Sequence, residues 1–196
     1  MFHDISDPIL SRMRYLEEVD ARDRQDGTPR SRRMRQIPPE TGRFIALAAA
    51  STPPGAMLEV GTSAGYSALW ISLACDRLRR TLTTIDNDPF KTQLASETFR
   101  LAGVEDFVHP VEGDARQLLP RYQEIAFCFL DTDKRLYQEC YDIVVPKLVS
   151  GGMLLVDNAV SHADSLTSFL QYVEEDARVD SIVISIGKGV LLCRKL

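Results

Sequence analysis

The sequence lacks the features that mark several large classes of protein. No apolar stretch approaches the roughly 20 residues that a membrane-spanning helix needs, so we expect no contact with a membrane. The first residues show no charged region followed by an apolar one, and we therefore expect no secretory signal. Four cysteines without paired spacing predict reduced, mostly buried thiols and a cytoplasmic location.

A strong excess of positive charge is also missing. The net charge of −5 does not predict a dedicated nucleic-acid-binding protein. The exception is a local cluster formed by Arg30, Arg32, Arg33 and Arg35. We favour a solvated or subunit-contacting arm for this cluster, and a patch that binds RNA or phosphate remains the alternative.

The most informative stretch is a short apolar strand that leads through a glycine-containing turn into a helix. No Gly-Lys-Ser/Thr follows the turn, which argues against the phosphate loop of an NTPase. Gly61 and Gly65 have Gly-x-x-x-Gly spacing, unlike that of dinucleotide enzymes, and the nearby Glu59 would repel a pyrophosphate. A cationic cofactor without phosphate, S-adenosylmethionine, fits better. We expect it to contact Glu59, Gly61, Thr62, Ser63 and Gly65, with Tyr66 and Ser67 at its methionine end; core packing is the alternative for Tyr66.

Strands and helices alternate after residue 57, which predicts an α/β fold with a doubly wound, Rossmann-like sheet and helices on both faces. We expect a single domain (1–196), with an N-terminal helical segment (1–50) and a sheet core (57–196). The predicted strands are 57–60, 81–85, 107–112, 125–130 and 153–157. Predicted helices follow Asp7-Pro8, span 39–50, run from 89 to Gly103, and run from about 134 to 149.

The end of the chain predicts a β-hairpin, because apolar runs at 181–186 and 190–194 flank Gly187-Lys188-Gly189. The hairpin would place one antiparallel strand in an otherwise parallel sheet of seven strands, an arrangement used by methyltransferases. Between the two N-terminal helices, residues 24–36 are polar and contain glycine and proline, which predicts a flexible connector.

Polar residues follow the predicted strands, and in open α/β sheets ligands bind at that edge. Asp86, followed by Asn87, ends the second strand, where a carboxylate can accept both ribose hydroxyls. Asn87 or Asp88 is left to cap the next helix. Asp114, between Gly113 and Ala115, would face the adenine, although a simple helix cap is a serious alternative.

A second polar group consists of Asp131, Asp157 and Asn158 at neighbouring strand ends. These hard oxygen donors suit Mg²⁺, Mn²⁺ or Ca²⁺, and no cluster of histidine and cysteine predicts zinc. Lys134 lies one helical turn after Asp131, on the same side. It is either a general base or a surface lysine that pairs with Asp133, and these residues alone leave the choice open.

Together these segments resemble the cation-dependent O-methyltransferases related to catechol and caffeoyl-CoA O-methyltransferases. The matching segments are 58–67, 84–86, 112–115, 130–134, 151–152, 157–158 and 186–189. The resemblance implies S-adenosylmethionine as methyl donor, a divalent ion held by Asp131, Asp157 and Asn158, Lys134 as base, and a homodimer. The family usually has a bulky residue soon after the Asp-Asn pair, whereas Ala-Val-Ser-His follows here, before a short segment.

Our first hypothesis is therefore methyl transfer to a hydroxyl of a small, catechol-like acceptor. An RNA hydroxyl, such as a wobble uridine of tRNA, is the nearest alternative, and the arginine cluster would support it. A non-catalytic subunit that binds S-adenosylmethionine is a further alternative. An NAD-dependent dehydrogenase is disfavoured by the glycine spacing and the closing hairpin.

Overall fold

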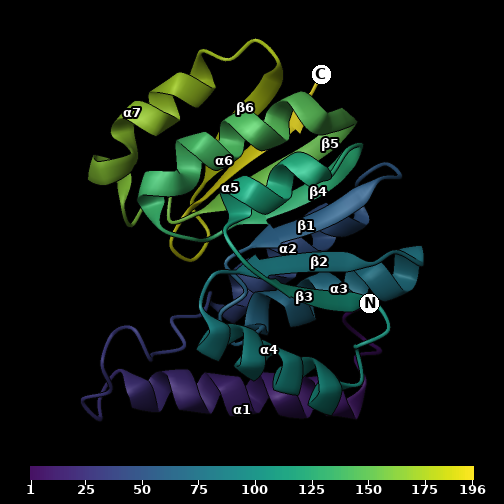
Figure 1. The fold of residues 1–196 in the computed structure, drawn as a ribbon, viewed down its shortest axis with the longest axis vertical. Helices are drawn as coiled ribbons and strands as arrows, with labels where there is room; N and C mark the ends of the chain where they lie inside the picture. The colour runs from purple at the N-terminus through teal and green to yellow at the C-terminus, as the bar shows by residue number, and fades with distance from the viewer.

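Seven strands form the sheet at the centre of the molecule (Figure 1). The computed structural model describes residues 1–196 throughout. The strands are β1 (Ala56–Val60), β2 (Leu82–Asp86), β3 (Val108–Glu112), β4 (Ile125–Leu130), β5 (Leu148–Asp157), β6 (Val179–Ile184) and β7 (Val190–Lys195). Their order is β3-β2-β1-β4-β5-β7-β6. β7 runs antiparallel to both of its neighbours, whereas the pairs from β3 to β5 are parallel. The predicted sheet and closing hairpin are thereby confirmed.

Helices cover both faces of the sheet, as its alternating residues require. Successive residues of β4 serve opposite cores: Phe127 belongs to the cluster beneath α3 and α4, and Cys128 to the one beneath α6 and α7. The helices are α1 (Asp7–Asp23), α2 (Pro39–Ala50), α3 (Tyr66–Leu78), α4 (Pro89–Ala102), α5 (Ala115–Leu118), α6 (Tyr137–Val144) and α7 (Ala163–Glu174). α1 packs on α4, on the side of α4 that faces away from the sheet (Figure 1). No helix combines the length and apolar character needed to cross a membrane.

The predicted helix over 134–149 is wrong at both ends. A 3₁₀ turn occupies Lys134–Leu136, α6 ends at Val144, and a second 3₁₀ turn covers Val145–Lys147. Pro146 has no amide hydrogen to donate to the carbonyl four residues earlier, so the α-helical ladder cannot continue through it, which explains the early end.

β5 consequently begins at Leu148, five residues before its predicted start, and it contains the two glycines expected to follow the helix. Between the pairs Ile125–Leu148 and Phe127–Met153, β5 holds more residues than β4. Gly152 lies in this irregularity, where a β-carbon would crowd three main-chain carbonyl oxygens. The sequence analysis also missed α7, whose buried Leu166, Phe169 and Val173 cover β5 and the hairpin.

The turn between β1 and α3 brings two strands of the sheet into very close approach. Gly61 has φ +104°, and a β-carbon there would overlap the carbonyl oxygen of Asp131. The Asp131 amide donates to the carbonyl of Val60 at 2.9 Å, which fixes this approach. Gly61 is therefore required twice, for its backbone conformation and for space.

We predict that Gly61→Ala destabilises the protein by about 2–4 kcal/mol, because left-handed strain and a main-chain clash add together. Gly103→Ala is the matched control: φ there is also positive, at +67°, but the space around it is open. It should cost only about 1 kcal/mol. Urea unfolding of both variants makes the comparison, and equal losses would contradict the clash.

Candidate active site

A pocket of about 1200 Å³ opens at the carboxyl ends of the parallel strands. It lies where the strand order reverses between β1 and β4, the place where open α/β sheets bind ligands. Its walls come from the turn after β1, the ends of β2 and β4, Asn158 after β5, and the connector between α1 and α2. Most lining residues are polar or charged. The pocket therefore suits a polar ligand.

The turn after β1 forms one side of the pocket, and five of the residues predicted to contact the cofactor line it: Gly61, Thr62, Ser63, Tyr66 and Ser67. Gly65 does not: its φ of +87° turns the chain into α3, and a β-carbon would strike the ring of Phe99. The hydroxyl of Tyr66 donates to Glu17 of α1 at 2.6 Å, so its polar end is already engaged.

Glu59 lies beneath this turn and outside the pocket wall. The side chain is fully buried and accepts a hydrogen bond from Thr84 Oγ1 at 2.5 Å, while its other oxygen, Oε1, has no partner. Thr84 in turn contacts the hydroxyl of Thr62 at 2.6 Å. Burial raises the pKa of Glu59 to about 7, with nearby Asp131 and Asp86 adding to the shift. Glu59 thus supports the turn from inside the core.

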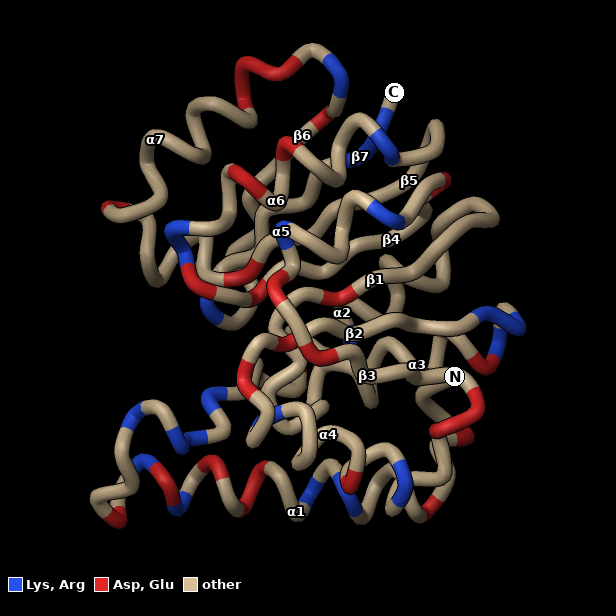
Figure 2. The backbone as a smooth tube through the Cα atoms, in the orientation of Figure 1, with Lys and Arg blue, Asp and Glu red and all other residues tan.

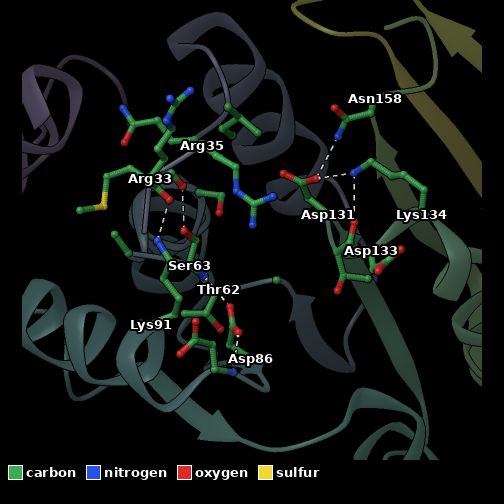
Figure 3. A pocket seen from close by; sticks show the side chains of 18 of the residues that line it. Arg33, Arg35, Thr62, Ser63, Asp86, Lys91, Asp131, Asp133, Lys134 and Asn158 are labelled. Carbon is green, nitrogen blue, oxygen red and sulfur yellow. Dashed lines mark hydrogen bonds and ion pairs between the residues drawn. The ribbon is translucent and has the colours of Figure 1, made fainter. Parts of the chain in front are cut away.

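Asp86 ends β2 and faces the pocket (Figure 3). One carboxylate oxygen accepts from the Ser63 amide at 2.8 Å, and the other from the Asp88 amide at 3.0 Å. Ser63 holds a left-handed φ of +46° in this contact. Asp88 caps α4 by accepting from the Phe90 amide, as one of the two predicted cap residues. Asp86 is therefore free of the capping role, and Asn87 beside it also lines the pocket.

Asp114 takes the alternative role of a helix cap. It accepts from the Arg116 amide at 2.9 Å and pairs with the Arg116 guanidinium at 2.7 Å. Those hydrogen bonds lower the pKa of Asp114. Gly113, Asp114 and Ala115 do not line the pocket, whereas Arg116 does. An adenine contact of Asp114 is not supported by this arrangement.

Asp131, Asp157 and Asn158 meet at one point, as predicted. The Asn158 amide nitrogen donates to Asp131 Oδ1 and to Asp157 Oδ2, both at 2.9 Å. Asn158 adopts φ +69°, a left-handed conformation that asparagine tolerates better than most residues. Asp157 is fully buried and its Oδ1 has no partner. Burial, followed by the charge of the adjacent Asp131, raises the pKa of Asp157 well above its usual range.

Lys134 belongs to the same group, and its side chain extends toward the Asp131 carboxylate (Figure 3). Its ammonium donates to Asp131 Oδ1 at 3.1 Å, to the Thr132 carbonyl at 3.1 Å and to the Tyr137 hydroxyl at 2.6 Å. The Tyr137 hydroxyl donates onward to the carbonyl of Asp157 at 3.2 Å. Asp133, the alternative partner of Lys134, pairs with Arg135 instead. Lys134 thus belongs to the site and not to the solvated surface.

The connector between α1 and α2 forms the remaining wall, which differs from the expected free arm. Lys91 of α4 donates to the Arg33 carbonyl at 2.7 Å, and Ser63 Oγ donates to the Met34 carbonyl at 2.8 Å. Arg30, Arg33 and Arg35 line the pocket, whereas Arg32 lies over the ring of Phe90. In Figure 2 the basic residues that follow α1 lie at the end of the sheet where acidic residues follow the strands.

Comparison with known proteins identifies the family. A family model described as O-methyltransferase matches residues 12–196. The chain belongs to the O-methyltransferase family. It is 27% identical to a caffeoyl-CoA O-methyltransferase of Populus kitakamiensis, over 82% of this chain and 78% of that protein. A catechol O-methyltransferase of Niastella koreensis is 30% identical over 63% of this chain and 58% of its own length. The S-adenosylhomocysteine-bound methyltransferase PaMTH1 of Podospora anserina shares the fold, with a TM-score of 0.81 and 20% identity over 98% and 89% of the two chains.

The predicted enzyme class, an S-adenosylmethionine-dependent O-methyltransferase, is thus confirmed. Within the site, sequence reasoning missed Tyr137, Lys91 and the connector. Tyr137 lies three residues after Lys134, a helical spacing that would have revealed it. Lys91 is only 4% exposed on a largely polar helix, and nothing in the sequence indicates its burial.

The raised pKa of Glu59 predicts how the stability of this O-methyltransferase depends on pH. Between about pH 4.5 and 7 the folded protein holds a proton on Glu59 that the unfolded chain releases, so the free energy of unfolding falls as pH rises. The Glu59→Gln side chain does not titrate, so its free energy of unfolding does not show this fall. Between about pH 4.5 and 7 the variant should therefore gain about 1–3 kcal/mol in free energy of unfolding relative to the unmodified protein. Urea unfolding at several pH values measures the difference. Glu112→Gln, at an exposed position, is the control, and identical pH profiles for the two variants would contradict the assignment.

Proposed function

We propose that this O-methyltransferase methylates a hydroxyl of a small, catechol-like acceptor and needs a divalent cation held by Asp131, Asp157 and Asn158. The observation that carries the proposal is Asp157, a fully buried carboxylate whose Oδ1 has no partner, beside a second carboxylate. The names of the catechol and caffeoyl-CoA relatives support the class of acceptor.

The residues present suit a divalent cation. The two carboxylates would form a hard oxygen donor set of the kind that Mg²⁺, Mn²⁺ and Ca²⁺ prefer, and the amide oxygen of Asn158 would join them if the side-chain amide, whose nitrogen now faces both carboxylates, turned over. A buried carboxylate without a full set of partners is costly, and the raised pKa of Asp157 expresses that cost. A cation bound here would remove the cost, and would lower the pKa of a hydroxyl that it contacts.

The chain's own residues would orient the acceptor and receive its proton. Lys134 is the proposed proton acceptor in its neutral amine form, which would become the ammonium on taking the proton of the acceptor hydroxyl; its nitrogen lies 3.1 Å from Asp131 Oδ1 and faces the pocket. Tyr137 holds that amine in place through its 2.6 Å hydrogen bond. Methyl transfer needs little else from the protein than alignment of the oxygen with the sulfonium methyl and a suitable charge environment.

The cofactor would lie along the turn after β1. Asp86 is the proposed ribose ligand, because its carboxylate faces the pocket and is anchored by two backbone amides. Each carboxylate oxygen keeps a further lone pair after accepting one amide hydrogen bond, so the two oxygens can still accept two ribose hydroxyls. The methionine end would lie near Ser67, at the start of α3.

The short segment after Asn158 shapes the acceptor side. The amides of Val160 and Ser161 donate to the carbonyl of Lys188 in the hairpin turn, so this segment folds back onto β7. His162 and Lys188 then line the pocket in place of a bulky side chain. A homodimer and a cytoplasmic location complete the proposal, on the strength of the family resemblance and the cysteine pattern.

We predict that Asp86→Asn weakens binding of S-adenosylmethionine about 10- to 100-fold, because the amide loses the charge that strengthens two hydrogen bonds. Asp88→Asn is the matched control, since it removes a charge from the same turn and asparagine still caps α4. Titration calorimetry measures both, with NAD as a second ligand. Stronger binding of NAD than of S-adenosylmethionine would contradict the cofactor site.

The decisive experiment follows methyl transfer from labelled S-adenosylmethionine to catechol and to bulk tRNA, with Mg²⁺ and with EDTA. We expect labelled catechol only with Mg²⁺, and a loss of about 100-fold or more in Asp157→Asn, which keeps the shape but removes the charge. Asp164→Asn, an exposed position on α7, should retain activity. Calorimetry with Mg²⁺ on the same variants separates loss of the cation from other causes.

Lys134→Ala tests the non-catalytic alternative in the same assay. A loss of transfer with cofactor binding retained would support the proposed role of Lys134. Labelling that persists in EDTA would contradict the cation site. Labelling of tRNA alone would favour the RNA alternative.

A further inference from the structure

Basic residues line the pocket of this enzyme, and the proposed reaction uses only Lys134 among them. Nine Lys or Arg residues line the pocket: Arg24, Arg30, Arg33, Arg35, Lys91, Arg116, Lys134, Arg135 and Lys188. Four of them form ion pairs with neighbouring carboxylates: Arg24 with Asp20, Arg116 with Asp114, Lys134 with Asp131 and Arg135 with Asp133. Three donate to main-chain carbonyls, Arg33 to Thr28, Lys91 to Arg33 and Lys188 to Gln36. Only Arg30 and Arg35 have a side chain without a hydrogen bond or ion pair to the protein.

Arg35 is the better placed of these two. Figure 3 shows its side chain reaching from the connector into the pocket, toward the side that holds Asp131. The residue is exposed, and the nearby Lys91 has a pKa lowered by burial and by the charge of Arg35. An arginine left without a partner inside a pocket retains all five donors for a ligand.

The backbone beneath Arg35 is held in a strained conformation. Its φ of +52° is left-handed, which is uncommon for a residue other than glycine, asparagine or aspartate. Three elements hold the residues around Arg35 by donating to their main-chain carbonyls. Lys91 of α4 donates to Arg33, Ser63 donates to Met34 from the turn after β1 (residues 61–65, the proposed cofactor turn), and Lys188 of the hairpin donates to Gln36. Strain that the surroundings enforce in this way is typical of positions with a role in binding.

We propose that Arg35 binds an anionic group of the acceptor, a carboxylate or a phosphate, remote from the hydroxyl that is methylated. The planar guanidinium matches either group with two parallel hydrogen bonds. Opposite it lie the carboxylates of the proposed cation site, which would receive the other end of the same molecule. The inference thus rests on the proposed small-molecule acceptor, and it adds the charge that this acceptor carries.

The test compares acceptors that share a catechol ring and differ in charge. Catechol itself carries no anionic group. The second acceptor, 3,4-dihydroxybenzoate, adds a carboxylate, and the third, the coenzyme A thioester of caffeate, adds phosphates. The quantity to compare is the preference ratio, which is kcat/KM for the better anionic acceptor divided by kcat/KM for catechol. We expect this ratio to fall about 10- to 100-fold in Arg35→Gln, mainly because KM for the anionic acceptor rises. Arg35→Lys should retain part of this ratio, because lysine keeps the positive charge but cannot make the two parallel hydrogen bonds of a guanidinium.

Arg32→Gln is the matched control, since Arg32 lies on the same segment but over the ring of Phe90 and outside the pocket wall. It should keep the ratio. The proposal is overturned if the ratio is unchanged in Arg35→Gln, or if that variant mainly weakens binding of S-adenosylmethionine. It is also overturned if only tRNA is methylated and the Arg32 and Arg35 variants lose that activity equally.

A binding measurement separates failure of this inference from failure of the proposed function. Calorimetry with 3,4-dihydroxybenzoate and with the coenzyme A thioester needs no turnover, and is done with S-adenosylhomocysteine and Mg²⁺ present. Weaker binding in Arg35→Gln than in Arg32→Gln supports the anion site even if catechol is never methylated. Equal binding of both probes to the two variants overturns it even if catechol is a good acceptor.

Discussion

The contact between Gly61 and the Asp131 carbonyl is the constraint on which the rest of the site depends. It lies between β1 and β4, where the strand order reverses, and it joins the cofactor turn directly to the strand end that carries Asp131 and leads to Lys134. Because no side chain separates the two segments, the proposed methyl donor and the proposed base are positioned by one piece of backbone. Because alignment is the main contribution of an enzyme to methyl transfer, this close approach would set how the donor and the base of the proposed reaction lie relative to each other.

The second constraint is electrostatic. Glu59 and Asp157 are both fully buried near the same edge of the sheet, and each has one carboxylate oxygen without a partner. The pKa values of both carboxyl groups are raised, chiefly by burial. A cation near either group would favour its ionised form. The proposed ligands, a sulfonium cofactor and a divalent ion, have the charge that these two carboxylates need.

The parts of this structure that sequence could predict are those governed by local rules. Alternating apolar residues and glycine turns placed all seven strands, and the Gly-x-x-x-Gly turn indicated the cofactor class. Ligands bind at the carboxyl ends of the strands in open sheets, and this rule predicts from the sequence that Asp86, Asp131 and Asp157 lie at one edge. The helix at 134–149 failed because Pro146 and the irregular pairing of β5 outweighed an apolar stripe at helical spacing.

What sequence could not predict depends on contacts between distant segments. Residues 24–36 are polar and contain turn-forming residues. This pattern is found both in loops exposed to solvent and in loops fixed by hydrogen bonds to the rest of the protein. Their position comes from Lys91, Ser63 and Lys188, which lie 58, 29 and 152 residues from the groups they contact. No local pattern indicates such pairings.

The same contacts join the wall that carries Arg35 to the cofactor turn. Ser63 uses its amide for Asp86 and its hydroxyl for Met34, so a single residue touches both sides. A shift of the turn after β1 would therefore act on the connector through this serine, in addition to the ties from Lys91 and Lys188. The proposed cofactor side of the pocket and the wall that carries Arg35 are thus joined through a single side chain, because the groups that Ser63 contacts belong to both.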